Sequence, residues 1–161
     1  MPDSGTTSQI LEHLQAHSPW VVPIVAFAVR TGMRRGEIVA LQWRDVDLDA
    51  VNPSVSVRRS IVFLDNGDIS VGAPKTASGT RNVLLDNPTV ALLRDRRAEV
   101  EGMAKQRGTS VSGSDHVFGD IERRPVRSSS LSRVFRRAAQ AVGSPVTAFH
   151  SLRHLHAIEL L

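Results

Sequence analysis

The sequence predicts a mainly helical domain that carries one small three-stranded antiparallel sheet, an α+β fold. Apolar residues recur at helical spacing over most of the 161 residues, whereas residues 54–85 alternate between apolar and polar side chains. The length fits one domain with its own core. Because no internal repeat or long linker interrupts the chain, residues 1–161 are expected to form one domain.

Two helices are expected in the N-terminal part of the chain. Thr6 and Gln9 resemble a capping box, which predicts a helix through "QILEHLQAH". Ser18 and Pro19 resemble the cap and first position of a second, apolar helix. Pro23 is expected to kink this helix or delay its start, because proline donates no backbone hydrogen bond.

Gly32 is expected to end the apolar helix, because glycine adopts the left-handed conformation without strain. A further helix follows directly, with Ile38, Val39 and Leu41 on its apolar face. Residues 54–85 then predict three short antiparallel strands, joined by turns at "DNGD" and "KTASGT".

Three more helices are expected in the second half of the chain. The first is capped by Asn87-Pro88 and ends at Gly108. The second, "SSSLSRVFRRAAQAVG", is amphipathic, and the third begins near His150. The amphipathic helix carries arginines on one face and apolar residues on the other: Leu131, Val134, Phe135 and Ala138.

Several classes of protein are excluded by composition. The absence of cysteine rules out disulfides, cysteine nucleophiles and thiolate metal sites. The apolar stretch from Trp20 to Val29 is too short to span a bilayer. The first residues, "MPDSGTTSQ", lack the basic and apolar regions of a signal peptide, so a cytoplasmic protein is expected.

The positive charge is almost entirely arginine and is concentrated near the C-terminus. Only Lys75 and Lys105 are lysines among the 20 basic residues. Residues 121–161 hold seven arginines against two glutamates, a net charge of +5. Arginine suits bidentate recognition of phosphate, which favours nucleic acid as the partner. On charge alone, a solubilising surface is an equally good interpretation.

Four separated residues could together hold a phosphodiester. Arg34 follows the helix stop and begins the next helix, Lys75 lies in a turn between strands, and His150 and Arg153 are three residues apart on one helix face. In-line substitution at phosphorus needs cationic clamps on the non-bridging oxygens and a proton donor for the leaving oxygen. Taken singly, each residue also fits an ordinary solvated or capping role.

The three segments "TGMRRGEIVALQWRDVDLD", "PKTASGTRNVLL" and "FHSLRHLHAIELL" resemble, in this order, the tyrosine recombinase family of phage integrases and their relatives. The resemblance extends from about Thr7 to the last residue and implies the catalytic-domain fold of that family. It implies that Arg34 and Arg153 are the two catalytic arginines. Lys75 would protonate the departing 5′ oxygen, and His150 would assist proton transfer.

Four further residues near these catalytic candidates are also expected to have roles. By the resemblance, Glu37 orients the Arg34 guanidinium, and His154 supports the site structurally more than catalytically. Arg35 is expected on the solvent or DNA-backbone side. For Arg81, contact with the DNA backbone and exposure to solvent are equally weighted. The resemblance also implies double-stranded DNA as the partner and a tetramer on DNA.

The family's nucleophile is a tyrosine downstream of the second arginine, and this chain contains no tyrosine. The expectation is a catalytic domain incomplete at its C-terminus and without the family's N-terminal DNA-binding domain. It is either a piece of a longer recombinase or a natural remnant, and on both interpretations this chain alone does not cleave DNA. The alternative function is a non-catalytic DNA-binding module.

A metal site is disfavoured. His150, His154 and His156 cluster near the C-terminus, but no acidic or cysteine ligand lies beside them and Arg153 would repel a cation. The sequence therefore predicts neither a metal nor an organic cofactor.

Overall fold

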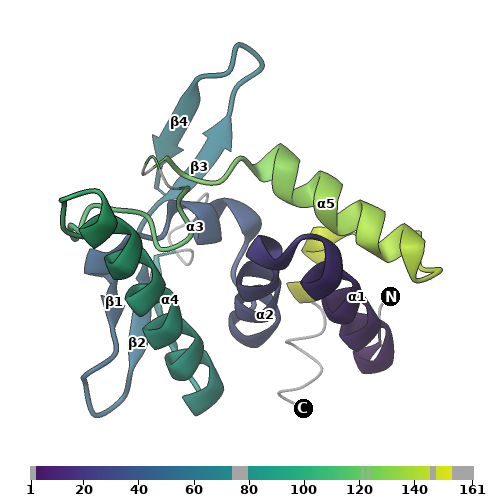
Figure 1. Cartoon of the computed structure of the whole chain (residues 1–161), viewed down its shortest axis with the longest axis horizontal. Coiled ribbons are helices and arrows are strands. Elements are labelled where there is room, and N and C mark those ends of the chain that lie inside the picture. The colour runs from purple at the N-terminus through teal and green to yellow at the C-terminus, as the bar shows by residue number, and fades with distance from the viewer. Residues whose placement is uncertain (1–2, 74–79, 121, 123, 146–147, 154–161) are drawn as a thin grey trace. The chain divides into compact units, whose positions relative to one another are not determined.

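The computed structural model describes residues 3–73, 80–120, 122, 124–145 and 148–153, and the chain divides into two compact units. Unit 1 combines residues 1–35 with 127–161, and unit 2 comprises residues 36–126. Unit 1 is therefore built from both ends of the chain. Unit 2 lies between them in sequence, and it contains every strand of the described residues (Figure 1).

Unit 1 begins with helix α1 (Ser4–His17). Its cap is Asp3, whose carboxylate accepts a hydrogen bond from the Thr6 amide at 2.6 Å. The expectation that Thr6 and Gln9 form the capping box is therefore wrong. The helix starts earlier because an aspartate is available three residues before Thr6.

The apolar helix expected next begins in two steps. Pro19 opens a 3₁₀ turn, η1 (Pro19–Val21), and Pro23 lies in the first turn of α2 (Val22–Thr31). The prediction that Pro23 delays this helix is confirmed. Gly32 ends α2 with φ 66°, and its amide donates to the carbonyl of Ala28 at 3.0 Å, as predicted.

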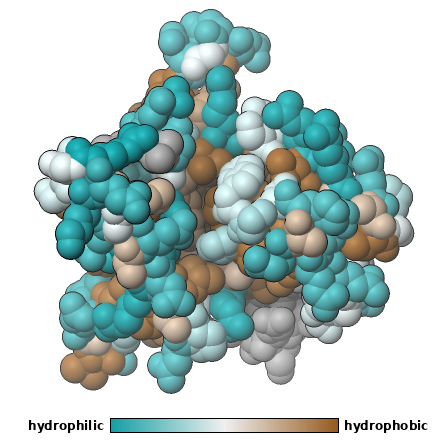
Figure 2. Space-filling view, in the orientation of Figure 1, coloured by the Kyte–Doolittle hydropathy of each residue, from teal (hydrophilic) through white to brown (hydrophobic). Residues whose placement is uncertain are grey.

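The C-terminal part of unit 1 consists of α5 (Ser128–Ala141) and the 3₁₀ turn η4 (Phe149–Ser151). The amphipathic pattern predicted for α5 is confirmed, and hydrophilic side chains cover this helix in Figure 2. The core of unit 1 draws on both ends of the chain, and it includes Ile10, Leu14, Val21, Val25, Phe27, Leu131, Phe135, Phe149 and Leu152.

The strands of unit 2 form two sheets. Strand β2 (Ser54–Val57) pairs antiparallel with both β1 (Val46–Asp47) and β5 (Arg81–Leu84), in the order β1-β2-β5. Strands β3 (Ser60–Phe63) and β4 (Ile69–Gly72) form a separate hairpin. The small antiparallel sheet is confirmed, but the described part of residues 54–85 holds four strands, whereas three were predicted.

Two arginines interrupt the predicted first strand. Arg58 and Arg59 separate β2 from β3, and both side chains turn toward Asp45, which is buried. Arg59 Nη1 lies 2.5 Å from Asp45 Oδ2. These cations compensate the buried carboxylate, and residues 58 and 59 belong to neither strand.

Two helices complete unit 2. The six-residue α3 (Arg35–Ala40) starts at the boundary between the units, and α4 (Asn87–Gln106) follows the sheet. The cap of α4 is Asp86, which accepts from the Thr89 amide at 2.9 Å, so the cap lies one residue before the predicted Asn87-Pro88. Gly108 has φ 70° just after this helix. No helix in the described part of the chain is long and apolar enough to cross a membrane.

Gly36 lies where α3 approaches β3. A Cβ atom at this position would lie 2.5 Å from Ser60 Oγ and 3.0 Å from the backbone oxygen of Ile61. Gly36→Ala is therefore expected to lower the free energy of unfolding by about 1 to 3 kcal/mol, as overpacking does. Urea denaturation of the purified chain measures this change.

A matched control is available at Gly102 in α4, where a Cβ atom would meet nothing within 4 Å. Gly102→Ala is expected to raise the free energy of unfolding by up to about 1 kcal/mol, the ordinary helical preference for alanine. If both substitutions stabilise the protein, the close approach of α3 and β3 is not the constraint inferred here.

Candidate phosphate-binding site

The segment that carries Arg34 is fixed by hydrogen bonds between the Thr31 side chain and the backbone. The hydroxyl of Thr31 donates to the carbonyl of Phe27 at 2.7 Å, and it accepts from the amide of Met33 at 3.3 Å. Met33 is 1% exposed, so its side chain anchors the turn in the core. Arg34 comes next and is exposed, directly before α3 begins at Arg35.

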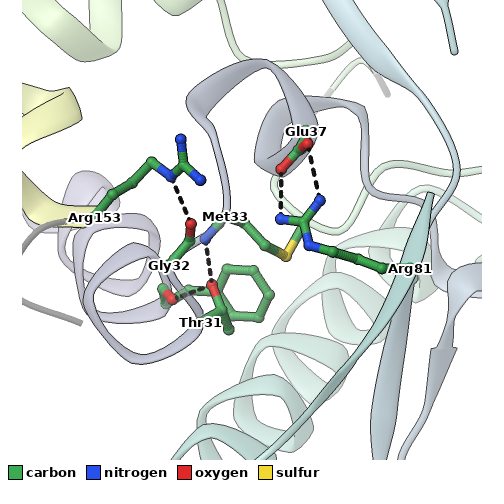
Figure 3. Close-up of polar contacts among 7 residues, drawn as sticks. Thr31, Gly32, Met33, Glu37, Arg81 and Arg153 are labelled. Atoms are coloured by element: carbon green, nitrogen blue, oxygen red, sulfur yellow. Dashed lines mark hydrogen bonds and ion pairs between the residues drawn. The ribbon is translucent and has the colours of Figure 1, made fainter. Parts of the chain in front are cut away.

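Arg153 reaches this same segment from the other end of the chain. Its Nε donates to the carbonyl oxygen of Gly32 at 2.8 Å (Figure 3). Gly32 lies two residues before Arg34, so unit 1 brings the two predicted catalytic arginines to one turn. Gly32, in the left-handed conformation, ends α2. Arg153 binds the carbonyl oxygen of this same residue.

The segment around His150 is held by two buried neighbours. Phe149 packs edge-to-face against Phe135 of α5, with ring centroids 5.6 Å apart. Leu152 is fully buried, whereas His150 is exposed. Aromatic and aliphatic anchors on both sides therefore fix the backbone of a histidine that faces solvent. Its assigned role in proton transfer stays a prediction.

In unit 2, Glu37 and Arg81 form a bidentate ion pair. Arg81 Nη1 lies 3.2 Å from Glu37 Oε1 and Nη2 lies 3.1 Å from Oε2 (Figure 3). The Glu37 side chain is 1% exposed and that of Arg81 is 29% exposed. Parallel guanidinium–carboxylate bonds of this kind are the strong, geometrically specific form of an ion pair.

The pair between Glu37 and Arg81 was not predicted from the sequence. Arg81 was assigned to the DNA backbone or to solvent, but its guanidinium binds a buried carboxylate. The two residues are 44 positions apart, so no local spacing signals their pairing. The orientation of Arg34 by Glu37 and the contact of Arg81 with DNA stay predictions.

Arg35 lies against α5. Its Nη1 donates to the hydroxyl of Ser132, and both residues belong to unit 1. The expected position of Arg35 on an exposed surface is consistent with its exposure. Lys75 and His154, the remaining predicted site residues, lie outside the described residues.

Charge is divided unequally between the two units. Unit 1 carries eight arginines against three carboxylates, a formal net charge of +5, whereas unit 2 carries −1 of the total of +4. Within the described residues, no group of three histidine, cysteine, aspartate or glutamate side chains is placed to hold a metal ion. The arrangement in unit 1 therefore suits an anionic ligand.

Comparison with known proteins places this geometry in context. The model of the phage integrase family matches residues 5–161. A XerC-like tyrosine recombinase of Caldanaerobacter subterraneus is 23% identical over 94% of this chain and 41% of its own length. The ICEBs1 integrase of Bacillus subtilis is 28% identical over 83% of this chain and 35% of its own length.

Among solved structures, the Tn1549 transposon integrase in complex with transposon right-end DNA is similar with a TM-score of 0.78. It is 17% identical, and the match covers 99% of this chain and 52% of that one. The two chains share a fold. The present chain spans less than half of the length of either curated relative described above.

Proposed function

The chain belongs to the phage integrase family, and from this premise we propose that it forms the phosphate-binding part of the catalytic domain of a site-specific DNA recombinase. The observation that carries the proposal is the bond from Arg153 to the carbonyl of Gly32. This bond brings the second predicted arginine to the turn that presents the first. A pair of arginines suits the two non-bridging oxygens of a phosphodiester.

In the proposed reaction, a tyrosine hydroxyl attacks the phosphorus atom, and the bond from phosphorus to the 5′ oxygen breaks. Arg34 and Arg153 stabilise the charge that develops on the non-bridging oxygens. Lys75 donates a proton to the departing 5′ oxygen, and His150 assists proton transfer. The product is a 3′-phosphotyrosyl bond, and attack by a 5′ hydroxyl on that bond rejoins a strand.

The nucleophile must come from outside these 161 residues, because they include no tyrosine. We propose that the chain alone binds double-stranded DNA without cleaving it. The recombining assembly would be a tetramer on DNA, as the family resemblance implies, and it would act in the cytoplasm.

The test combines binding and cleavage measurements on this chain. Fluorescence anisotropy with a duplex of about 30 base pairs is expected to show binding that weakens steeply with salt, because phosphate contacts release counterions. Incubation with supercoiled plasmid, followed by denaturing gel electrophoresis, is expected to show no covalent protein–DNA adduct.

Each measurement can contradict a different part of the proposal. A chain that fails to bind duplex DNA at low salt is not the phosphate-binding part of a recombinase. A covalent adduct from this chain would show that another residue serves as the nucleophile. If a longer form of the protein, which includes a tyrosine, binds DNA but never cleaves it, the result would favour the non-catalytic DNA-binding module.

A further inference from the structure

Helix α1 carries two histidines, one turn apart, at the surface of unit 1. His13 and His17 are four positions apart, so their side chains lie on the same side of the helix. They border the buried stripe of α1, which includes Ile10 and Leu14. His17 is exposed and His13 is half-buried, so a ligand from solvent can reach the pair.

The two imidazole rings are stacked against each other. Their centroids are 4.1 Å apart, and their planes are inclined by 18°. Two nitrogen ligands of one metal ion lie about 3 Å from each other, because each metal–nitrogen bond is about 2 Å long. A small tilt of the stacked rings is therefore enough to direct one nitrogen of each ring at the same ion.

The hydrogen bond of the His17 ring prepares it for metal coordination. Its Nδ1 lies 2.9 Å from the carbonyl oxygen of His13. A carbonyl oxygen can only accept, so Nδ1 carries the hydrogen, and in the neutral ring Nε2 keeps its lone pair. Metal-binding histidines commonly donate their second ring N–H to a backbone carbonyl in this way. Among the residues that the structure describes, none bonds a ring nitrogen of His13, so that ring can supply the second lone pair.

The electrostatic surroundings of the pair favour a cation. His17 is the last residue of α1, where the final carbonyl groups form the negative end of the helix dipole. The helix contains Glu12 but neither lysine nor arginine. The C-terminal histidines were disfavoured as ligands because Arg153 lies among them, and no such cation lies between His13 and His17.

We infer that His13 and His17 form a two-histidine site for a late first-row transition-metal ion, with water in the remaining coordination positions. Imidazole suits copper, nickel and zinc, whereas magnesium and calcium prefer oxygen ligands. Affinity at a nitrogen site rises along the series to copper and falls again at zinc, so Cu²⁺ should bind most tightly. The site is independent of the proposed function, which concerns other residues of the chain.

Calorimetric titration of the unmodified chain with Cu²⁺, in a buffer that does not coordinate metals, tests the site. The tightest binding is expected at a ratio of one ion to one chain. His13→Gln and His17→Gln should each weaken this binding about a hundredfold, because a single histidine loses the high effective concentration that links two ligands on one helix.

A matched control keeps two histidines in α1 and changes only their spacing. Combining His17→Gln with Gln15→His places the pair two positions apart, on opposite sides of the helix. This variant should bind Cu²⁺ as weakly as His17→Gln alone. A second control combines His150→Gln with His154→Gln, which removes the C-terminal pair at the same four-residue spacing, and it should retain the tight site. Circular dichroism verifies the folding of each variant.

Four results would overturn the inference. The first is tight binding that survives both single replacements in α1. The second is full affinity in the variant with altered spacing, because any two histidines on the helix would then suffice. The third is loss of the tight site in the variant that lacks His150 and His154, which would place the ion at the C-terminal histidines. The fourth is a ratio of one ion to two chains, because a second copy would then supply the ligands assigned to water.

Discussion

Replacing Arg81 with methionine is expected to lower the free energy of unfolding by about 3 to 5 kcal/mol. The Glu37 side chain is 1% exposed, and the substitution removes both guanidinium bonds to its carboxylate. A buried carboxylate that loses two bonds to a guanidinium has little solvation to replace them. Urea denaturation, followed by circular dichroism, measures the change.

Two controls distinguish this effect from the removal of any surface charge. Arg94→Met breaks an exposed pair with Asp49, whose side chain is 91% exposed, and is expected to cost less than about 1 kcal/mol. Combining Arg81→Met with Glu37→Leu removes both charges, and it should recover most of the stability. If Arg81→Met costs no more than Arg94→Met, the ion pair does not stabilise unit 2.

Local sequence signals predicted the α-helices of the described residues well, from α1 to α5. Gly32 ends α2 because only a residue tolerant of positive φ fits there, and the 3.6-residue pattern of α5 identifies its buried face. The two predicted caps were misplaced because Asp3 accepts from the Thr6 amide and Asp86 accepts from the Thr89 amide, so each cap lies earlier in the chain. The N-terminal end of a helix depends on which side chain best accepts a hydrogen bond from its first free amides. More than one such side chain was present before each of these two helices.

Long-range features were not accessible from the sequence. Arg58 and Arg59, which lie between β2 and β3, pair with the buried Asp45 of an earlier segment. Glu37 and Arg81 are likewise paired across 44 positions. Such contacts depend on tertiary packing, for which residue spacing carries no signal. The sequence therefore predicted which residues bear charge, but not which of them neutralise one another.

The same distinction applies to the candidate site. The motifs identified Arg34 and Arg153, and the bond from Arg153 to Gly32 brings the second arginine to the turn of the first. The arginines of α5 were visible only as a basic helix face. The contact between Arg35 and Ser132 of α5 joins residues 97 positions apart, so no local pattern predicts it.

Arg34→Ala is expected to reduce DNA cleavage on the order of hundredfold or more, in a form of the protein that includes a downstream tyrosine. The guanidinium is assigned to the charge that develops on phosphorus oxygens during attack, so its removal raises the barrier more than it weakens binding. Cleavage of supercoiled target DNA measures the rate, and anisotropy measures affinity for the same site.

Arg35→Ala is the matched control, because it removes the same charge one residue further along the chain. Arg35 is expected on the DNA-backbone side and binds Ser132 of α5, so its replacement should weaken DNA binding and make its salt dependence shallower by about 0.9. Cleavage of bound DNA should continue near its original rate. An Arg34→Ala protein that still cleaves at that rate would contradict the assignment. The opposite pattern, with Arg35 alone essential for cleavage, would move the catalytic role to the second arginine of the "TGMRRGE" segment.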